Sequence, residues 1–238
     1  MTLSRPLSLV GVVALSVSLA ACGSNGKSDT PALTGPSTPA AASSTPASTA
    51  SGPCAPMAAP SKTPLHFSSE PAVTISGTFY TLTIVTNCGT VVAKLDGAKA
   101  PHTVNSFAFL ASKHYFDNTP CHRLTTQGIY VLQCGDPSGT GSGGPGYTIP
   151  DENLTGATYP AGTLAMANTG QPHTGGSQFF LCYDNTQLPP QYTPFGTVTS
   201  GLDVLKAIAA AGEDDSNGPG DGHPKTPVVI KTFTVVKA

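Results

Sequence analysis

From about residue 73 onwards, short stretches of the chain alternate apolar and polar side chains. Residues 79–86, with the sequence FYTLTIVT, show this alternation and predict a half-buried strand. Asn87-Cys88-Gly89 then supplies turn residues, and residues 90–95 return as a second strand. Further short strands are expected, in chain order, at residues 121–124, 129–134, 163–167, 177–182, 195–198 and 228–236.

In two stretches the apolar residues recur every three or four positions, as in a helix, instead of every second position, as in a strand. Pro101 opens the first, because its fixed φ suits the first helical turn, and Val104 and Phe107 follow at helical spacing. The second covers residues 202–211 and stops at Gly212. Many short strands, two helices and glycine-rich connections predict a β-barrel with helical caps.

The N-terminus has a different pattern. Residues 1–21 hold one charge, Arg5, before an uncharged run of 15 residues from Leu7 to Ala21. This is shorter than the roughly 20 residues that span a bilayer, and it is typical of a secretory signal peptide. The run ends in LAACG, which resembles the bacterial lipobox, in which Cys22 would be acylated; an ordinary signal peptide with a chance cysteine is the alternative. We therefore expect lipidation at Cys22 and a protein anchored at the extracytoplasmic face of the cell membrane.

A low-complexity stretch follows the cysteine. Between residues 23 and 64 the chain is dominated by Ser, Thr, Ala, Gly and Pro. Such a composition buries too little apolar surface to offset the entropy of ordering the chain. The sequence thus predicts three parts: a signal peptide over 1–21, a lipidated cysteine and disordered linker over 22–72, and one folded domain over 73–238.

Composition narrows the function classes. Charged residues make up 10% of the chain and the formal net charge is −2, which argues against nucleic-acid binding, because that depends on clustered Lys and Arg. The chain has six cysteines, so five remain beside Cys22 and at least one of these is free or pairs outside the chain. Cys121 and Cys134 lie on strands expected to pair and are one candidate disulfide; Cys182 is another possible partner, and the connectivity stays open.

Conventional catalytic motifs are missing from the sequence. Residues 175–179 read GGSQF, which departs from G-x-S-x-G at its last position. The six histidines lack the spacing of a metal site built on one helix or hairpin, and no Gly-Lys-Ser/Thr follows the glycines of 139–146. We expect neither covalent nor metal chemistry, and no cofactor.

What remains is a set of polar residues inside apolar strands, namely Arg123, Gln133 and Asn168. In order along residues 77–237, the motifs around them resemble the cyclophilin family. The quoted motifs are residues 103–107, YFDNT (115–119), CHR (121–123), QCGD (133–136), GTLAMAN (162–168), GSQFF (176–180) and FG (195–196). The resemblance implies an eight-stranded antiparallel closed barrel capped by two helices, and peptidyl-prolyl cis-trans isomerase activity.

The chemistry of that reaction suits these residue types. Rotation about the X-Pro bond breaks amide resonance and meets a barrier of about 18–20 kcal/mol. By the resemblance, the Arg123 guanidinium hydrogen-bonds the prolyl nitrogen, while Gln133 and Asn168 hold the rotating carbonyl and its neighbours. An apolar slot would take the proline ring. The substrate-binding residues implied by the resemblance are Tyr130, Val131, Ala167, Gln178, Phe180, Leu188 and Tyr192.

The chain departs from the family pattern near this slot. Two extra residues separate Arg123 from Gln133, so a register shifted by one would bring Ile129 to the slot in place of Tyr130. Gln187 stands where many members have Trp, and Tyr192 where many have His. We expect activity to survive these changes with an altered peptide preference.

The sequence thus predicts an isomerase that accelerates the folding of exported proteins. Its partners would be their proline-containing segments and, through the lipid anchor, the membrane; nucleic acid is not expected, and we expect a monomer. The alternative is a catalytically weak peptide-binding or holdase module. Arg123 and Gln133 favour the enzyme.

Overall fold

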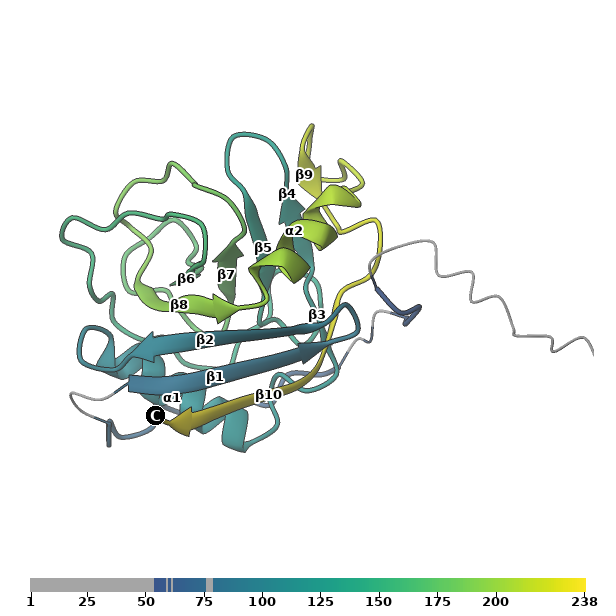
Figure 1. The fold of residues 1–238 in the computed structure, drawn as a ribbon. Coiled ribbons are helices and arrows are strands. Elements are labelled where there is room, and N and C mark those ends of the chain that lie inside the picture. The colour runs from purple at the N-terminus through teal and green to yellow at the C-terminus, as the bar shows by residue number, and fades with distance from the viewer. Residues whose placement is uncertain (1–53, 59, 61, 76–78) are drawn as a thin grey trace, which may run out of the picture. The chain divides into compact units, whose positions relative to one another are not determined.

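The computed structural model describes residues 54–58, 60, 62–75 and 79–238 (Figure 1). The predicted signal peptide, Cys22 and most of the predicted linker therefore lie outside the described residues. Within the described part, no helix is long and apolar enough to cross a membrane.

The described strands form one antiparallel sheet of ten, in the order β3-β10-β1-β2-β8-β6-β7-β5-β4-β9. The elements are β1 (Phe79–Thr86), β2 (Thr90–Asp96), α1 (Pro101–Ser112), β3 (Thr119–Pro120), β4 (Arg123–Thr125), β5 (Val131–Cys134), β6 (Thr163–Met166), β7 (Phe179–Cys182), β8 (Pro194–Ser200), α2 (Leu202–Ala210), β9 (Asp221–Gly222) and β10 (Val229–Lys237).

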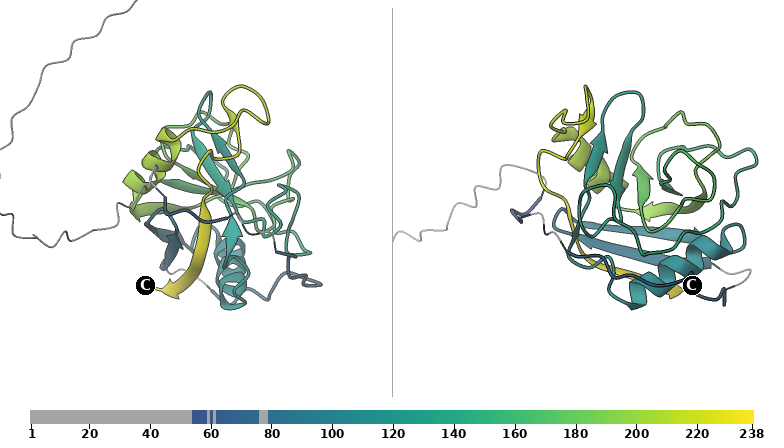
Figure 2. Two further views of the ribbon diagram at one scale, coloured as in Figure 1. Left: turned by 90° about the vertical axis from the view of Figure 1, so that its right-hand side faces the viewer. Right: turned by 180° about the vertical axis from the view of Figure 1, so that it is seen from behind.

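The connection between β3 and β4 shows that this sheet is curled. The two strands stand first and ninth in the sheet, yet only Cys121 and His122 separate them along the chain. The sheet must therefore bend until its two ends come close together, as the ribbon views show (Figures 1 and 2). Within the described residues no strand pairing joins β3 to β9, so the structure gives a curled antiparallel sheet where a closed barrel was expected. The strands are ten where eight were expected, because the two-residue strands β3 and β9 flank the sheet.

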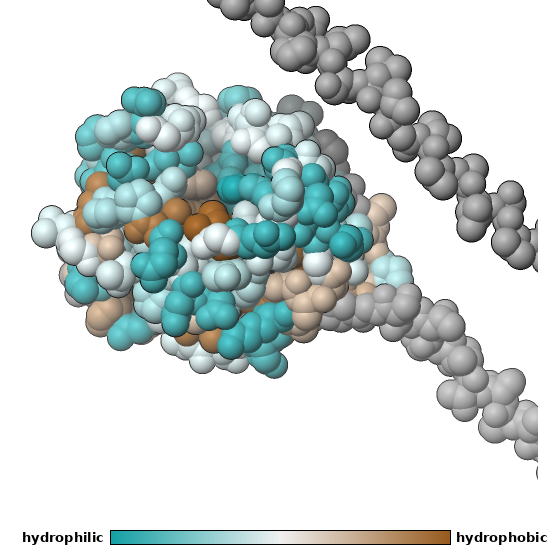
Figure 3. Space-filling model, turned by 90° about the horizontal axis from the view of Figure 1, so that it is seen from above, coloured by the Kyte–Doolittle hydropathy of each residue, from teal (hydrophilic) through white to brown (hydrophobic). Residues whose placement is uncertain are grey.

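The core follows from the predicted periodicity. In β1, Leu82 and Ile84 are buried, while the residue between them is partly exposed. In α1, Phe107 is fully buried and its ring contacts four other phenylalanine rings. α1 packs against β10 and β2, and α2 packs against β2 (Figure 2). On the face seen from above, the most apolar residues form a strip between polar residues, and paler apolar patches lie toward the edges (Figure 3).

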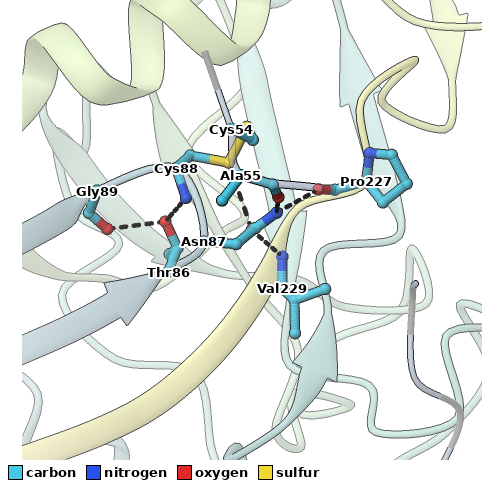
Figure 4. Close-up of a disulfide and its surroundings, with 8 residues drawn as sticks. All are labelled: Cys54, Ala55, Thr86, Asn87, Cys88, Gly89, Pro227 and Val229. Carbon is cyan, nitrogen blue, oxygen red and sulfur yellow. Dashed lines mark hydrogen bonds between the residues drawn. A yellow bond between two sulfur atoms is a disulfide. The ribbon is translucent and has the colours of Figure 1, made fainter. Parts of the chain in front are cut away.

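The predicted linker extended through residue 72, but several of the described residues from Cys54 to Ile75 are bonded to the domain or packed on it. Cys54 forms a disulfide with Cys88, in the turn between β1 and β2 (Figure 4). Beside it, the Asn87 side-chain amide donates to the carbonyl oxygens of Ala55 and Pro227, each at 2.9 Å. One amide group therefore ties the N-terminal segment to a loop near the C-terminus.

Further along, isolated apolar side chains fasten the same segment. The Phe67 ring packs edge-on against Phe109, with centroids 4.9 Å apart, and the Phe67 N–H donates to the carbonyl of Pro145. Ile75 is buried in the core. Single anchors spaced along a proline-rich chain produce no periodicity, which is why composition alone indicated a linker.

The other three described cysteines form one further disulfide and leave one free thiol, which accounts for the odd number of cysteines beside Cys22. Cys121 pairs with Cys134, the candidate given by the sequence. Cys182 is free and buried, and burial raises the pKa of its thiol to about 12. Its thiol is thus protonated at neutral pH and unreactive.

Candidate active site

Three neighbouring strands bring the predicted catalytic residues together. β4 pairs with β5 so that Arg123 lies opposite Gln133, and β5 pairs with β7 so that Gln133 lies opposite Phe180. Residues opposite one another on paired strands project to the same face of the sheet. The register therefore lines up a cation, an amide and an aromatic ring across the sheet, although they are far apart in sequence.

These side chains open onto a cavity of about 150 Å³. It is lined by Arg123, Ile129, Val131, Gln133, Ala167, Asn168, Phe180, Leu188 and Tyr192. All the predicted catalytic and substrate-binding residues are among these except Tyr130 and Gln178. Arg123 is the single charged residue in this lining, as far as the described residues go.

One wall of the cavity is apolar. Phe180 and Val131 are both buried, and the Tyr192 ring stands edge-on to Phe180 with centroids 5.6 Å apart. The hydroxyl of the buried Tyr159 donates to the Tyr192 carbonyl at 2.8 Å, which holds this wall in place. A small, aromatic-lined slot of this kind suits an aliphatic ring.

The opposite side is built on Arg123, which Asp221 of β9 holds by two bonds. Arg123 Nε donates to Asp221 Oδ1 at 2.8 Å and Nη2 to Oδ2 at 2.6 Å, while Nη1 donates to Gln133 Oε1 at 3.1 Å. Hydrogen bonds to Asp221 raise the pKa of Arg123 against the opposing effect of burial, and hydrogen bonds from Arg123 lower the pKa of Asp221.

Asp221 was not predicted as a site residue from the sequence. It lies 98 residues from Arg123 in a glycine-rich loop with no pattern of its own, so no sequence signal marked it.

Gln133 is fixed from its other end as well. Its Nε2 donates to Gln178 Oε1 at 2.9 Å, and Gln178 Nε2 donates to the carbonyl oxygens of Gly141 and Gly143. Gln178 thus lies outside the small slot and lines a second cavity of about 820 Å³, which also includes Gln133 and Asn168. A chain leaving the slot past Asn168 would enter this second cavity.

Asn168 shapes the wall between the two cavities. Its side-chain Nδ2 donates to the Gln191 carbonyl at 2.8 Å, and its Oδ1 accepts from the Gly170 N–H at 3.0 Å. Both ends of the amide therefore already have backbone partners. The Asn168 amide is thus held in place much as the Gln133 amide is held by Arg123 and Gln178, and its contact with a bound peptide stays a prediction.

Tyr130 is the predicted contact that the structure places elsewhere. Ile129 and Val131 line the slot, whereas the Tyr130 ring packs against Tyr183, with centroids 6.0 Å apart. Ile129 and Tyr130 precede β5, which begins at Val131, and the chain there places Ile129 against the slot and the Tyr130 ring beside Tyr183. Ile129, the alternative that the two-residue insertion left open, lines the slot, while Val131 and Gln133 line it as predicted. Gln187 lines a separate cavity of about 240 Å³ beside Leu188.

His122 is a second feature that the sequence did not interpret. It precedes Arg123, is 8% exposed, and neither of its ring nitrogens has a partner within hydrogen-bonding geometry among the described residues. Burial lowers the pKa of His122, with Asp136 opposing, so the imidazole is neutral at neutral pH. It therefore adds no second positive charge beside the guanidinium.

Comparison with known proteins gives one consistent result. Residues 81–235 match the family model described as cyclophilin type peptidyl-prolyl cis-trans isomerase/CLD. A probable peptidyl-prolyl cis-trans isomerase B of Mycobacterium leprae is 48% identical over 164 residues, covering 63% of this chain and 55% of that protein. The corresponding protein of Mycobacterium tuberculosis is 47% identical over 163 residues, covering 63% and 52%. The chain thus spans about half the length of these two relatives.

More compact relatives match over nearly their whole length. A peptidyl-prolyl cis-trans isomerase-like 1 of Neurospora crassa is 37% identical over 159 residues, which cover 65% of this chain and 93% of that protein. A crystal structure of a Cryptosporidium parvum cyclophilin type peptidyl-prolyl cis-trans isomerase superposes with a TM-score of 0.58 at 29% identity, covering 67% of this chain and 98% of the other. The family model, these relatives and the shared architecture agree, and the chain belongs to the cyclophilin-type peptidyl-prolyl cis-trans isomerase family.

Proposed function

We propose that this protein catalyses cis-trans isomerisation of X-Pro peptide bonds. The observation that carries the proposal is the Arg123 guanidinium held at one side of a small slot whose other wall is apolar. A proline ring fits the apolar wall, and its nitrogen then faces the one charged group of the described lining.

The rate gain that this geometry must supply is modest. Each 1.36 kcal/mol removed from the barrier gives a factor of ten, so a thousandfold acceleration needs about 4 kcal/mol. A guanidinium N–H that bonds the prolyl nitrogen stabilises the pyramidal nitrogen of the twisted amide, in which resonance is lost. Arg123 is fixed in place before substrate binds, so little reorganisation is required in the transition state. Gln133 offers its amide to the carbonyl that rotates.

A protease-coupled peptide assay tests this function. It should use the full chain with Cys22 replaced by Ser, so that the protein can be handled without a lipid. We expect isomerisation of an Ala-Pro peptide well above the uncatalysed rate. A protein that suppresses aggregation of an unfolding client but leaves the isomerisation rate at its uncatalysed value would support the holdase alternative instead.

We also propose that the protein acts outside the cytoplasm, on the proline-containing segments of exported proteins. The sequence LAACG at residues 19–23 supports lipidation of Cys22, and the two disulfides fit an oxidising compartment. Cys22→Ser should move the protein from the membrane fraction to the soluble one and leave kcat/KM unchanged. A variant that stays fully membrane-bound would contradict the anchor.

A further inference from the structure

Asp221 accepts two of the hydrogen bonds that decide how Arg123 is presented. A guanidinium has five N–H donors in a fixed plane. Two of them go to the Asp221 carboxylate and one to Gln133, which leaves one N–H on each of Nη1 and Nη2 for a ligand. The Arg123 and Asp221 side chains are 33% and 26% exposed, so the pair lies at the rim of the slot, partly shielded from water.

The loop around Asp221 is constructed to hold its carboxylate. β9 pairs with β4 so that Asp221 lies opposite Thr125, two residues after Arg123. Asn217 Nδ2 donates to Asp221 Oδ1 at 3.1 Å, and the Asp221 N–H donates to the Gly218 carbonyl at 2.9 Å. Both the backbone and the carboxylate of Asp221 are therefore fixed independently of Arg123.

Gly222, the residue after Asp221, is constrained as well. A Cβ at Gly222 would lie 2.8 Å from the backbone nitrogens of Asp215 and Ser216, so only glycine fits there without displacing the loop. This close approach packs β9 against the stretch from Asp214 to Ser216. The loop thus brings a carboxylate to Arg123 from a distant part of the chain.

We propose that Asp221 is a positioning residue for the isomerase reaction: its carboxylate fixes the plane of the Arg123 guanidinium so that the remaining N–H groups face the slot. A bidentate carboxylate fixes both the position and the plane of an arginine, which a single hydrogen bond does not. Misplacing a reacting group by an ångström lowers a rate by about a hundredfold in unfavourable cases. This inference rests on the proposed function, and it adds a residue that acts through Arg123 without touching the peptide.

A double-mutant cycle tests the proposal in the full chain carrying Cys22→Ser. We expect Asp221→Asn to lower kcat/KM about tenfold while the circular dichroism spectrum is retained, and Asp221→Glu to recover part of the loss. In an Arg123→Ala background, Asp221→Asn should change kcat/KM by less than twofold, because the group that it positions is gone. The matched control is Asp214→Asn, which removes a carboxylate from the same loop that does not contact Arg123 and should leave kcat/KM within twofold of the parent.

Two outcomes would overturn the inference. One is full activity in a folded Asp221→Asn variant. The other is an equal loss on adding Asp221→Asn to the parent and to the Arg123→Ala variant, which would indicate a general effect on the fold.

A second measurement does not depend on activity. The Arg123 Nε–H proton should give a slowly exchanging NMR signal in the parent and in Asp214→Asn, and lose that protection in Asp221→Asn. If the parent shows this signal but has no isomerase activity, the proposed function fails while the Arg123–Asp221 contact stands.

Discussion

The two disulfides close loops in regions of the molecule with contrasting structure. Cys121–Cys134 links the connection between β3 and β4 to the last residue of β5, beside the paired residues Arg123 and Gln133. Cys54–Cys88 links the N-terminal segment to the β1–β2 turn, where the backbone contact between the described residues of the two segments is one hydrogen bond, from Ala55 to Asn87.

Chain entropy alone would not distinguish these two cross-links. For sequence separations of 13 and 34 residues, the loop-closure model gives about 3 and about 4 kcal/mol of stabilisation respectively. The difference lies in what each bond keeps in place. The Cys121–Cys134 bond lies beside β4 and β5, which hydrogen bonds already hold in register. The Cys54–Cys88 bond holds the start of a segment whose other hydrogen bonds to the domain, apart from those of Ala55 and among the described residues, begin at Lys62.

The largest effect on activity should come from replacing Arg123, which lies close to the Cys121–Cys134 disulfide. Arg123→Ala removes the charged group of the slot and should lower kcat/KM by about tenfold or more, with a small change in the free energy of unfolding. Lys231→Ala, which removes an exposed cation on β10, is the control and should retain the parent rate. An Arg123→Ala variant that folds and keeps its rate would refute the assigned mechanism.

A smaller effect is expected from opening the Cys121–Cys134 disulfide. In a Cys54→Ala/Cys88→Ala background, reduction should lower the free energy of unfolding by about 3 kcal/mol. The rate should fall no more than threefold, because the register of Arg123 with Gln133 is set by strand pairing. Urea unfolding and the peptide assay, each run on oxidised and reduced protein, measure the two quantities. A rate loss approaching that of Arg123→Ala would mean that the disulfide itself positions the site.

The smallest effect on the rate should follow Cys54→Ala/Cys88→Ala. We expect kcat/KM to stay within about 1.5-fold of the parent. Limited proteolysis should cleave the chain more readily between Ala55 and Lys62, because the hydrogen bonds further along, such as those of Lys62 and Thr74, do not depend on the disulfide. Unchanged protection of this segment would show that those contacts are sufficient without the disulfide.

Local periodicity explains which parts of the fold were predictable. β1 was predicted with its observed bounds, and α1 begins at Pro101 as expected, because each shows its own regular pattern of apolar residues. β9 was missed, since Asp221-Gly222 is a two-residue strand defined by its partner β4. The sheet order was likewise set by contacts between distant strands.

The residues of the site likewise fall into those that the sequence predicted and those that it did not. Arg123, Gln133 and Phe180 were identified through family motifs, and the structure brings them to one cavity. Tyr130 was placed at the slot because the two-residue insertion left the register of this strand open. The role of Asp221 depends on an ion pair with Arg123, 98 residues away, which no local pattern of the sequence marks.

The Cys54–Cys88 bond also has a mechanical consequence. A pull on the chain preceding residue 54 would pass through a covalent bond into the turn between β1 and β2, and the segment from 55 to 75 would carry none of the load. β1 and β2 are paired along seven residue positions, so the force would be distributed over a continuous ladder of hydrogen bonds. Without the disulfide, the same force would peel away the N-terminal segment one contact at a time.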